Sequence, residues 1–475
     1  MGVLVALLPV VAIVVSMSVL NLRAASACGV GLFLSVILGL WGQSLQASSV
    51  IPILLHGFLS SWDLVFLTIG GSLMGSVLTA NGTTATLSAV LASNHGARLL
   101  LAGTCLGVIP AVSALIGPGA YFVGIPILIS LGMPPARAIP VFLLSQSWGV
   151  ANFSFGLPCM AMEASTGVPA QVIAQRSSPF IVLLIAVGAV MLRVIAPELR
   201  TIRLAHYSAI AGAAMGGAVL GGRLGPAFPA LIGGIVGTVV ALILESDRSM
   251  YGKLREISFI KILPVLIVVT HSILTRVPSI EAFLGRMAPS VSMAVGTVTF
   301  DFLNSTGFIL LVASSIGYLG LGGESAGKCI RTTFRSWDAI VVAPIAISLA
   351  RVMGAAGMLA RVVEATTSLG RTAFALCMPL IGMLGQYVTG SLVSGALVVG
   401  RYVADVAASV GIEPGLAAAA TLVGGAPIVI LVPSKTALAC AAAQYQGEQR
   451  SIIRSGILVV FVSFVAMAAA IAVLV

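Results

Sequence analysis

The chain has 475 residues, of which 59% are hydrophobic and 8% are charged, and its mean hydropathy is +1.14. A soluble domain has about 25% charged residues, so a chain this poor in charge cannot cover a soluble surface, and most of it must face lipid. The net charge of +10 comes from basic residues dispersed in short loops, which is typical of membrane topology and argues against a nucleic-acid-binding patch.

Apolar runs of helix length recur along the whole chain. The first half of the pattern predicts helices at 3–21, 26–43, 62–79 and 97–115, a broken segment at 116–131 and a long segment at 135–162. The middle predicts helices at 178–196, 207–222, 226–244, 258–275 and 290–319. The last part predicts helices at 337–353 and 371–388, a broken segment at 389–410, a helix with a break at 413–445, and a final helix at 456–475.

Backbone polar groups in lipid must be paired within their own segment, so these runs predict an all-α polytopic membrane protein. We expect about 12–14 transmembrane segments in a single transporter domain, 1–475. The six cysteines are scattered, without a CxxC pair or a nearby histidine, and are predicted to be free packing residues. The sequence contains neither a His-rich cluster nor a phosphate-binding GxxxxGK[ST] loop, so we expect no metal and no cofactor.

A degenerate repeat runs through the sequence. Trp337-Asp338 follows Trp62-Asp63 at a distance of 275 positions (337 − 62), and Gly411–Pro414 follows Gly132–Pro135 at 279 positions (411 − 132). The pattern predicts repeat 1 at about 62–162 and repeat 2 at about 337–445. Repeated blocks that are interrupted by glycine and proline are typical of the binding region of secondary transporters.

The distribution of basic residues predicts that the two repeats are inverted. The loop before Trp62 has no Lys or Arg, whereas three basic residues precede Trp337 within ten positions. Basic loops favour the cytoplasmic side, so Arg193–Arg203, Glu245–Lys261 and Gly322–Arg335 are all predicted to be cytoplasmic. Inversion would allow alternating access around one site near the bilayer midplane.

Two breaks in the apolar pattern are candidate substrate sites. Gly117-Pro118-Gly119 interrupts the first repeat, because proline removes a helix donor and glycine admits unusual conformations. The matching stretch of the second repeat contains Thr389, Gly390, Ser391 and Ser394, whose hydroxyls can bind a carboxylate. Exposed N–H groups at a half-helix start suit an anion, although a packing kink and ordinary helix–helix contacts remain alternatives.

Three charged residues are candidates for substrate or proton chemistry. Lys435 follows Pro433-Ser434 within apolar sequence and could neutralise a carboxylate, or it could reach the cytoplasmic surface. Asp301 is predicted to be the most deeply placed acid, and Asp301 and Glu163 are the candidate proton carriers. The alternatives are a buried pairing of Asp301 with Arg351 and a loop position for Glu163. Arg401 and Asp405, four positions apart, are predicted to form an internal ion pair.

The chain resembles the bacterial L-lactate permease family over nearly its whole length. The resemblance is carried by Gly132-Met133-Pro134-Pro135-Ala136-Arg137-Ala138, by Val352–Met358 with Thr389-Gly390-Ser391, and by Gly411–Ala443 ending near Ser434 and Lys435. Val112 stands where the family has an acid. Tyr121, beside the first break, is a further candidate substrate-binding residue and stands where the family has a smaller residue. The family is similar to the wider ion transporter superfamily, which implies paired hairpins and an elevator-type homodimer.

The resemblance implies proton-coupled symport of lactate, glycolate or a similar small 2-hydroxy monocarboxylate across a bacterial cytoplasmic membrane. The expected partners are the carboxylate, protons and the lipid bilayer. Three alternatives stay open at this stage. They are a sodium-coupled or exchanger-type organic anion transporter, a passive channel, and an intramembrane enzyme, for which no nucleophile–base pair is visible. We therefore expect a transporter and not an enzyme.

Overall fold

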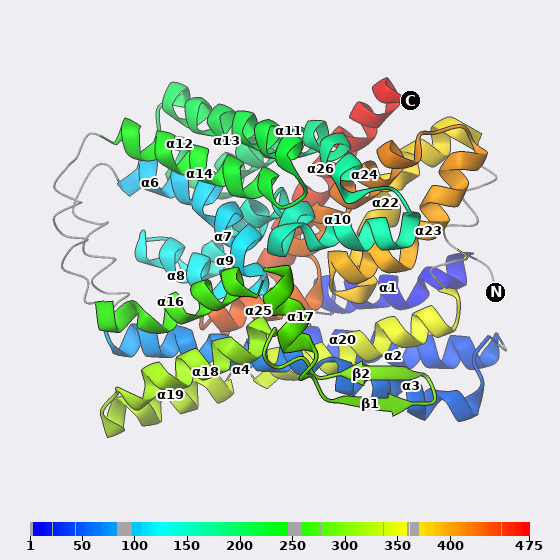
Figure 1. Cartoon of the computed structure of the whole chain (residues 1–475), viewed down its shortest axis with the longest axis horizontal. Coiled ribbons are helices and arrows are strands. Elements are labelled where there is room, and N and C mark those ends of the chain that lie inside the picture. The colour runs from blue at the N-terminus through cyan, green and yellow to red at the C-terminus, as the bar shows by residue number, and fades with distance from the viewer. Residues whose placement is uncertain are drawn as a thin grey trace.

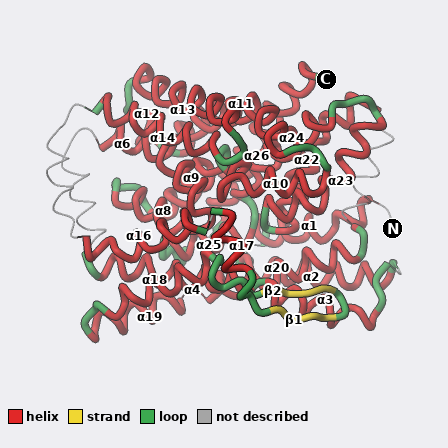
Figure 2. The backbone as a smooth tube through the Cα atoms, in the orientation of Figure 1, coloured by secondary structure: helices red, strands yellow, loops and turns green. Residues whose placement is uncertain are grey.

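The fold is almost entirely helical. The structure is a computed structural model that describes the whole chain except residues 1–2, 21, 43, 83–96, 246–258, 276, 336, 359–360, 362–369 and 448. Most of the predicted cytoplasmic loop Glu245–Lys261 lies outside the described residues. In the described part, helices fill the molecule and the strands form a single short hairpin (Figures 1 and 2). The predicted all-α class is confirmed.

The first part of the chain contains paired and interrupted helices. Its elements are α1 (Val3–Ser18), α2 (Ala24–Trp41), α3 (Ala47–Ser60), α4 (Trp62–Ala80), α6 (Ala97–Gly103), the π-helix η1 (Thr104–Val108), α7 (Ile109–Ile116), the 3-10 helix η2 (Gly117–Ala120), α8 (Tyr121–Ser130), α9 (Pro135–Ser147), the 3-10 helix η3 (Val150–Asn152) and α10 (Phe153–Thr166). The break predicted at the Gly117-Pro118-Gly119 cluster is the 3-10 turn η2.

The middle of the chain adds a layer of long helices, a hairpin and an amphipathic helix. Its elements are α11 (Ala170–Ile195), α12 (Pro197–Arg200), α13 (Leu204–Leu224), α14 (Phe228–Leu244), α16 (Phe259–Leu274), α17 (Pro278–Gly285), β1 (Ser290–Met293), β2 (Gly296–Thr299), α18 (Thr306–Leu319) and α19 (Gly323–Arg335). In Figure 1, α11 to α14 lie at the top of the view and the hairpin lies at the lower front.

The last part of the chain repeats the interrupted pattern of the first. Its elements are α20 (Trp337–Ala355), α22 (Gly370–Thr389), α23 (Leu392–Ser409), α24 (Pro414–Gly425), the 3-10 helix η5 (Ala426–Ile430), α25 (Pro433–Ala442) and α26 (Arg450–Leu474). Both α4 and α20 have 19 residues and begin at the paired tryptophans. Both α9 and α24 begin at a proline after a glycine of positive φ, +88° at Gly132 and +74° at Gly411.

Seven helices in the described part are long and apolar enough to cross a membrane, or eight if the bent pair Pro414–Ile430 and Pro433–Ala442 counts as one span. The bend in this pair is 51°. Six shorter apolar helices of 10–17 residues, α8, α14 and α18 among them, accompany these spans. A polytopic membrane protein with a broken or re-entrant helix is therefore confirmed.

One predicted helix is wrong in its first half. The segment 290–319 was expected to be a single helix, but β1 and β2 pair as an antiparallel hairpin with Ser290 opposite Thr299, and α18 begins only at Thr306. Polar and apolar residues alternate along this stretch with the period of a strand, and the backbone of Gly296 turns with a φ of +138°. The local period therefore overrides the general apolar character of the chain.

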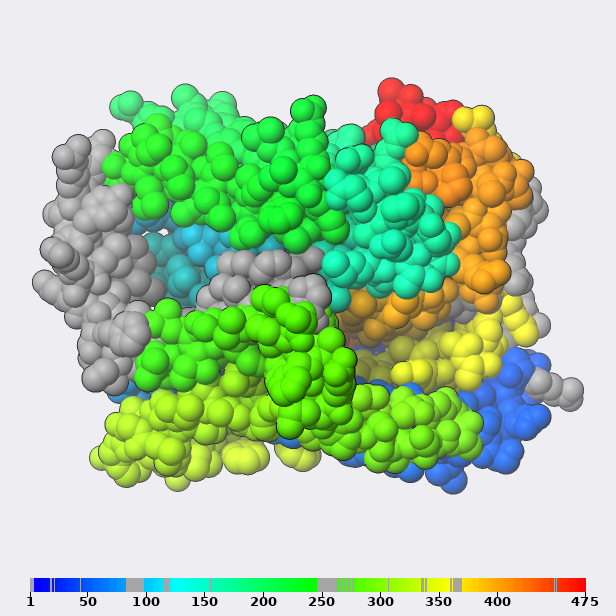
Figure 3. All heavy atoms as spheres, in the orientation of Figure 1, coloured from blue at the N-terminus to red at the C-terminus, as the bar shows by residue number. Residues whose placement is uncertain are grey.

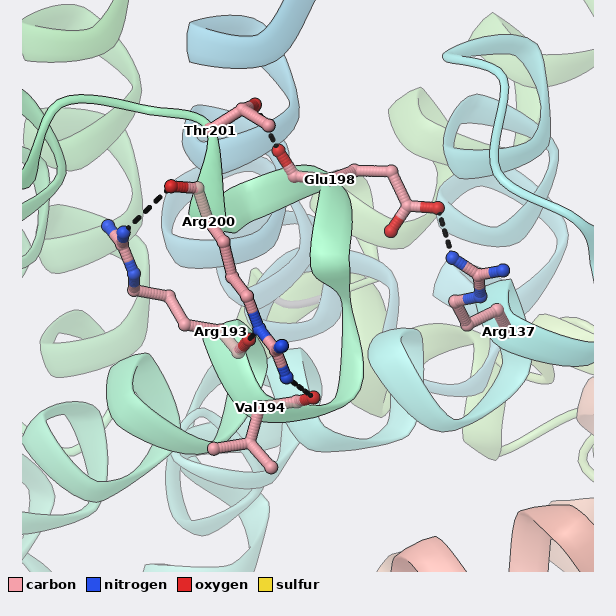
Figure 4. Close-up of polar contacts among 6 residues, drawn as sticks. All are labelled: Arg137, Arg193, Val194, Glu198, Arg200 and Thr201. Carbon is pink, nitrogen blue, oxygen red and sulfur yellow. Dashed lines mark hydrogen bonds and ion pairs between the residues drawn. The ribbon is translucent and has the colours of Figure 1, made fainter.

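In the charged turn between α11 and α13, arginine side chains donate hydrogen bonds to backbone carbonyls of the same turn (Figure 4). The guanidinium of Arg193 donates to the carbonyl of Arg200 at 3.1 Å, and the guanidinium of Arg200 donates to the carbonyls of Arg193 and Val194 at 2.6 and 2.7 Å. Arg137, at the start of α9, forms an ion pair with Glu198 in this turn. The turn is therefore a compact cap that ties α9 to α11 and α12.

The core consists of several buried clusters. One is centred on α4, α7, α8 and α9, a second joins α10 and α11 to α22, α23 and α24, and a third joins α1 and α2 to α20 and α25. Helix α18 packs along α4, and α25 contacts both α4 and α20. The cysteines are free, and five of the six are buried, as predicted. Arg401 and Asp405 form the predicted ion pair at 3.7 Å, but on the exposed face of α23 rather than inside the protein.

Candidate functional site

A large cavity lies where elements from the first, middle and last parts of the chain meet. Its volume is about 1090 Å³, and its walls come from α3, α4, α10, α17, α20, α22, α23, α25, the turn of the hairpin and the loop before α18. Figure 3 shows the surface hollowed between α10, in teal, and α20, in yellow, beside α17. The lining combines apolar side chains with hydroxyl, carboxylate and basic groups, so the cavity can hold a small polar solute.

The break in repeat 2 forms one wall of the cavity. Helix α22 ends at Thr389, Gly390 turns the backbone with a φ of +68°, and α23 begins at Leu392 with Ser391 as its cap. The hydroxyl of Thr389 lies within hydrogen-bond distance of the carbonyls of Gly385 and Ser391, at 2.8 and 2.7 Å, and accepts from the N–H of Ser391 at 3.3 Å. Thr389 therefore holds the shape of the break.

The caps of this break leave hydroxyl groups at the cavity. The Oγ of Ser391 accepts from the N–H of Ser394 at 3.4 Å, so its own proton can still be donated to a ligand. Ser394 is exposed to the same cavity one turn further on. The N-terminal end of α23 adds the partial positive charge of a helix start. This wall is suited to a carboxylate.

Lys435 supplies the positive charge. It lies in the first turn of α25, directly after the bend that follows η5, and its side chain lines the cavity. A Cβ placed on Gly390 would lie 2.9 Å from the Oγ of Ser434, so the starts of α23 and α25 meet closely here. In the described part of the chain, no hydrogen bond or ion pair occupies the ammonium group of Lys435. Two helix starts and one free cation therefore converge on one point.

Asp63 lines the same cavity from the first part of the chain. It lies in the first turn of α4, and its Oδ1 accepts hydrogen bonds from the hydroxyl of Ser305 and from the N–H of Gly307, the latter at 3.1 Å. Ser305 is also the N-cap of α18, accepting from the N–H of Phe308 at 2.9 Å. Asp63 and Lys435 are near enough to attract each other electrostatically. Within the residues that the structure describes, no direct ion pair joins the two side chains.

Other charged groups surround the rim of the cavity. Arg351 of α20 and Glu281 of α17 are exposed, and Asp301 is half-buried in the loop after the hairpin. Both oxygens of Asp301 accept from Asn304, Oδ1 from its N–H at 3.3 Å and Oδ2 from its side-chain amide at 2.8 Å. His56 of α3 is buried and lies 3.3 Å from the hydroxyl of Ser60.

The structure brings most of the predicted site residues of repeat 2 together. Asp301 lines the cavity, and so do five predicted residues of the last part of the chain, namely Thr389, Gly390, Ser391, Ser394 and Lys435. Ser434 lies directly beside Gly390. The expected pairing of Asp301 with Arg351 does not occur, because Asp301 binds Asn304 instead.

The predicted residues of repeat 1 lie elsewhere. Gly117 and Gly119 form the turn η2, which packs against α4 and α18. Among the side chains that the structure describes, Gly119 is not part of the cavity wall. Tyr121 is fully buried and packs on Phe142, with ring centroids 4.8 Å apart. Glu163 is exposed at the end of α10, and its carboxylate accepts from the N–H of Ala170 at 3.2 Å, which caps α11.

Asp63 and Ser305 were not predicted as site residues. The signal for Asp63 was present, because the tryptophan–aspartate pair opens the first copy of the repeat. An acid in the first turn of a helix is normally explained by the helix dipole, so nothing in the sequence assigned Asp63 to a site. Only the three-dimensional structure shows that Asp63 and Lys435 line the same cavity. Ser305 showed the composition of a helix cap, but the prediction placed it inside a helix.

The fold and the cavity define a multi-pass membrane protein in which interrupted helices surround a cavity lined by both apolar and polar groups. The family model for L-lactate permease matches residues 2–284 and 259–475, so the chain belongs to the L-lactate permease family. The chain is a multi-pass protein of the bacterial inner membrane. The family resemblance expected from the sequence is confirmed.

Individual relatives are distant, and two of the three described here extend over most of the chain. The L-lactate permease of Streptococcus iniae is 23% identical over 435 residues, which cover 86% of this chain and 91% of that protein. Glycolate permease GlcA of Escherichia coli (strain K12) is 22% identical over 515 residues, with 95% and 91% covered. The L-lactate permease of Escherichia coli (strain K12) is 27% identical over 186 residues, which cover 38% of this chain and 33% of that protein.

Proposed function

We propose that the chain is a secondary active transporter that carries a small 2-hydroxy monocarboxylate, of the lactate or glycolate kind, together with protons. The observation that carries the proposal is the meeting of Lys435 with the helix starts of α23 and α25 at one cavity. The names of the relatives, lactate and glycolate permeases, indicate the same class of solute.

The residues at the break have complementary roles in this proposal. Lys435 neutralises the carboxylate, because a single cation in an apolar span is stable only with an anionic partner nearby. The hydroxyls of Ser391 and Ser394 bind the carboxylate or the 2-hydroxyl, and the helix start behind them adds favourable electrostatics. Thr389 keeps the break open by its backbone contacts.

The repeat provides the means of alternating access. We propose that the chain is one transporter domain with repeat 1 at about 62–162 and repeat 2 at about 337–445, in opposite orientations. The matching starts of α4 and α20, and of α9 and α24, support this division. One wall of the cavity comes from each repeat, so a movement of one against the other would open the site to alternate sides. A homodimer stays a prediction, which light scattering of the purified protein would check.

Exchange in proteoliposomes tests the role of Lys435. Lys435→Ala should abolish counterflow of labelled lactate, whereas Lys435→Arg should keep part of it because the charge remains. Lys328→Ala is the matched control, since Lys328 is an exposed lysine of α19 paired with Glu324, and it should behave as wild type. Counterflow by Lys435→Ala at the wild-type rate would contradict the proposed site.

The coupling ion is tested separately. Uptake should follow an imposed proton gradient and should not respond to a sodium gradient of the same size. The opposite result would favour the sodium-coupled or exchanger-type alternative, and flux without uphill accumulation would indicate a channel.

A further inference from the structure

The cavity contains an acid whose contacts differ from those of the other acids around it. Asp63 uses one oxygen, Oδ1, for both Ser305 and Gly307, and in the described part of the chain its Oδ2 has no hydrogen-bond partner. Lys435 lies close enough to attract this carboxylate, and α25 packs against α4. Asp63 is therefore fixed on one side and open to the cavity on the other.

We propose that Asp63 carries the coupled proton and that Asp63 and the substrate carboxylate compete for Lys435. This inference rests on the proposed function, because it assumes a carboxylate substrate. It differs from the expectation based on the sequence alone, in which Asp301 or Glu163 carries the proton.

The charge balance at the cavity explains the coupling. In the empty cavity, the ammonium of Lys435 faces the ionised carboxylate of Asp63, and the pair is neutral. An entering carboxylate places two anions beside one cation, and two carboxylates that share a site do not both stay ionised at low cost. A proton that binds Oδ2 of Asp63 restores neutrality, and Lys435 then pairs with the substrate.

The hydrogen bonds of Asp63 allow this change without unfolding the site. Oδ1 keeps its acceptor role towards Gly307 when Oδ2 is protonated, so the N-terminus of α18 stays capped. Release of the substrate returns Lys435 to Asp63, which loses its proton to water. One proton therefore moves with each carboxylate, and the loaded and empty pairs carry the same net charge.

The other titratable groups around the cavity are less suited to this role. Glu281 and Arg351 are exposed at the rim, where water screens their charges. Both oxygens of Asp301 are bound to Asn304. His56 is buried in α3 beside Ser60 rather than beside the substrate-binding break. Asp63 alone, among the described acids of the cavity wall, combines a free oxygen with attraction to Lys435.

Asp63→Asn tests the proposal, because asparagine keeps the Oδ1 acceptor but cannot exchange a proton. In proteoliposomes with a pH gradient of one unit, one proton per carboxylate supports about tenfold accumulation by the wild type. The Asp63→Asn protein should show an accumulation ratio of about one. It should still exchange substrate, with a lower half-saturation concentration, because nothing competes for Lys435. Asp63→Glu should recover part of the accumulation.

Control variants separate this reading from others. Asp405→Asn removes an exposed acid of α23 and should accumulate substrate as the wild type does. Accumulation by Asp63→Asn at the wild-type level would overturn the proposal, and so would loss of coupling in Asp301→Asn instead. Loss of both exchange and accumulation in folded Asp63→Asn protein, monodisperse by size exclusion, would also overturn it. A wild type without any carboxylate exchange would refute the proposed function itself.

A measurement on the wild type avoids any folding defect of the variant. Dicyclohexylcarbodiimide modifies carboxyl groups in apolar surroundings through their protonated form. Mass spectrometry should place the modification on Asp63, with transport lost in proportion. Modification of Asp301 with Asp63 left untouched would overturn the assignment.

Discussion

The hydroxyl of Thr389 can be removed with almost no change of shape, and its loss should loosen the break in repeat 2. Thr389→Val deletes the contacts to the carbonyls of Gly385 and Ser391 and the acceptor for the N–H of Ser391. The carbonyl of Ser391 keeps a second donor, the N–H of Gly395 at 2.8 Å, and the carbonyl of Gly385 keeps its bond within α22. The N–H of Ser391 is therefore the group that loses its partner.

The expected magnitude follows from that single group. A backbone donor that loses its hydrogen bond costs about 1–2 kcal/mol, at the lower end here because the break borders the cavity and water can reach it. This corresponds to a decrease of about 1–2 °C in the midpoint of thermal unfolding, because the unfolding entropy of a 475-residue chain is about 1 kcal/mol per kelvin. If the bond also sets the position of the substrate-binding hydroxyls, the half-saturation concentration should rise by up to about tenfold.

Both quantities can be measured on the same preparation. The thermal midpoint of the purified protein in detergent gives the stability, and counterflow in proteoliposomes gives the half-saturation concentration. Thr389→Ser is the matched control, because it keeps the hydroxyl and loses only a methyl group. If Thr389→Val and Thr389→Ser were equal in both assays, the hydroxyl would have no role in shaping the break.

Two pairs of glycine substitutions, each a test and its control, provide further predictions. In Gly382→Ala, the new Cβ would lie 1.9 Å from the carbonyl oxygen of Thr421, where α22 crosses α24, so we expect a loss of about 3 kcal/mol in stability. Gly212→Ala, in open space on α13, should be neutral or slightly stabilising, and equal melting of the two variants would refute the close approach. Gly390→Ala forces a side chain onto a φ of +68° and should cost about 1–2 kcal/mol and reduce exchange. Gly132→Ala, at a φ of +88° outside the described cavity wall and with open space around the new Cβ, should lose stability from backbone strain alone and keep normal exchange. A normal exchange rate in both variants would exclude a role for Gly390 in the site.

Much of the architecture could be predicted because the signals are local. Composition alone requires helices in lipid, and the glycine and proline clusters mark the turns at η2 and η5. The positive φ of Gly390 lies within the predicted break. The hairpin at Ser290–Thr299 was missed although its alternating pattern is also local, because the surrounding apolar composition favoured a helix.

The candidate site was only half predictable, because its remaining contacts join distant parts of the chain. Lys435 was recognisable as a single charge in apolar sequence. The contacts of Asp63 depend on the packing of α4 against α18 and α25, which no local pattern reveals. The prediction for Asp301 did not anticipate Asn304, three positions further on, whose backbone and side chain occupy both carboxylate oxygens.

The bond between Asp63 and Ser305 joins residues 242 positions apart, and this separation constrains how the protein is made. The ribosome delivers α4 to the translocon long before it synthesises the cap of α18, and Lys435 emerges later still. A carboxylate that enters the membrane without a partner is unfavourable. During this interval Asp63 has neither Ser305 nor Lys435 beside it, so the cavity wall around this acid can be completed only after α18 and α25 have packed against α4.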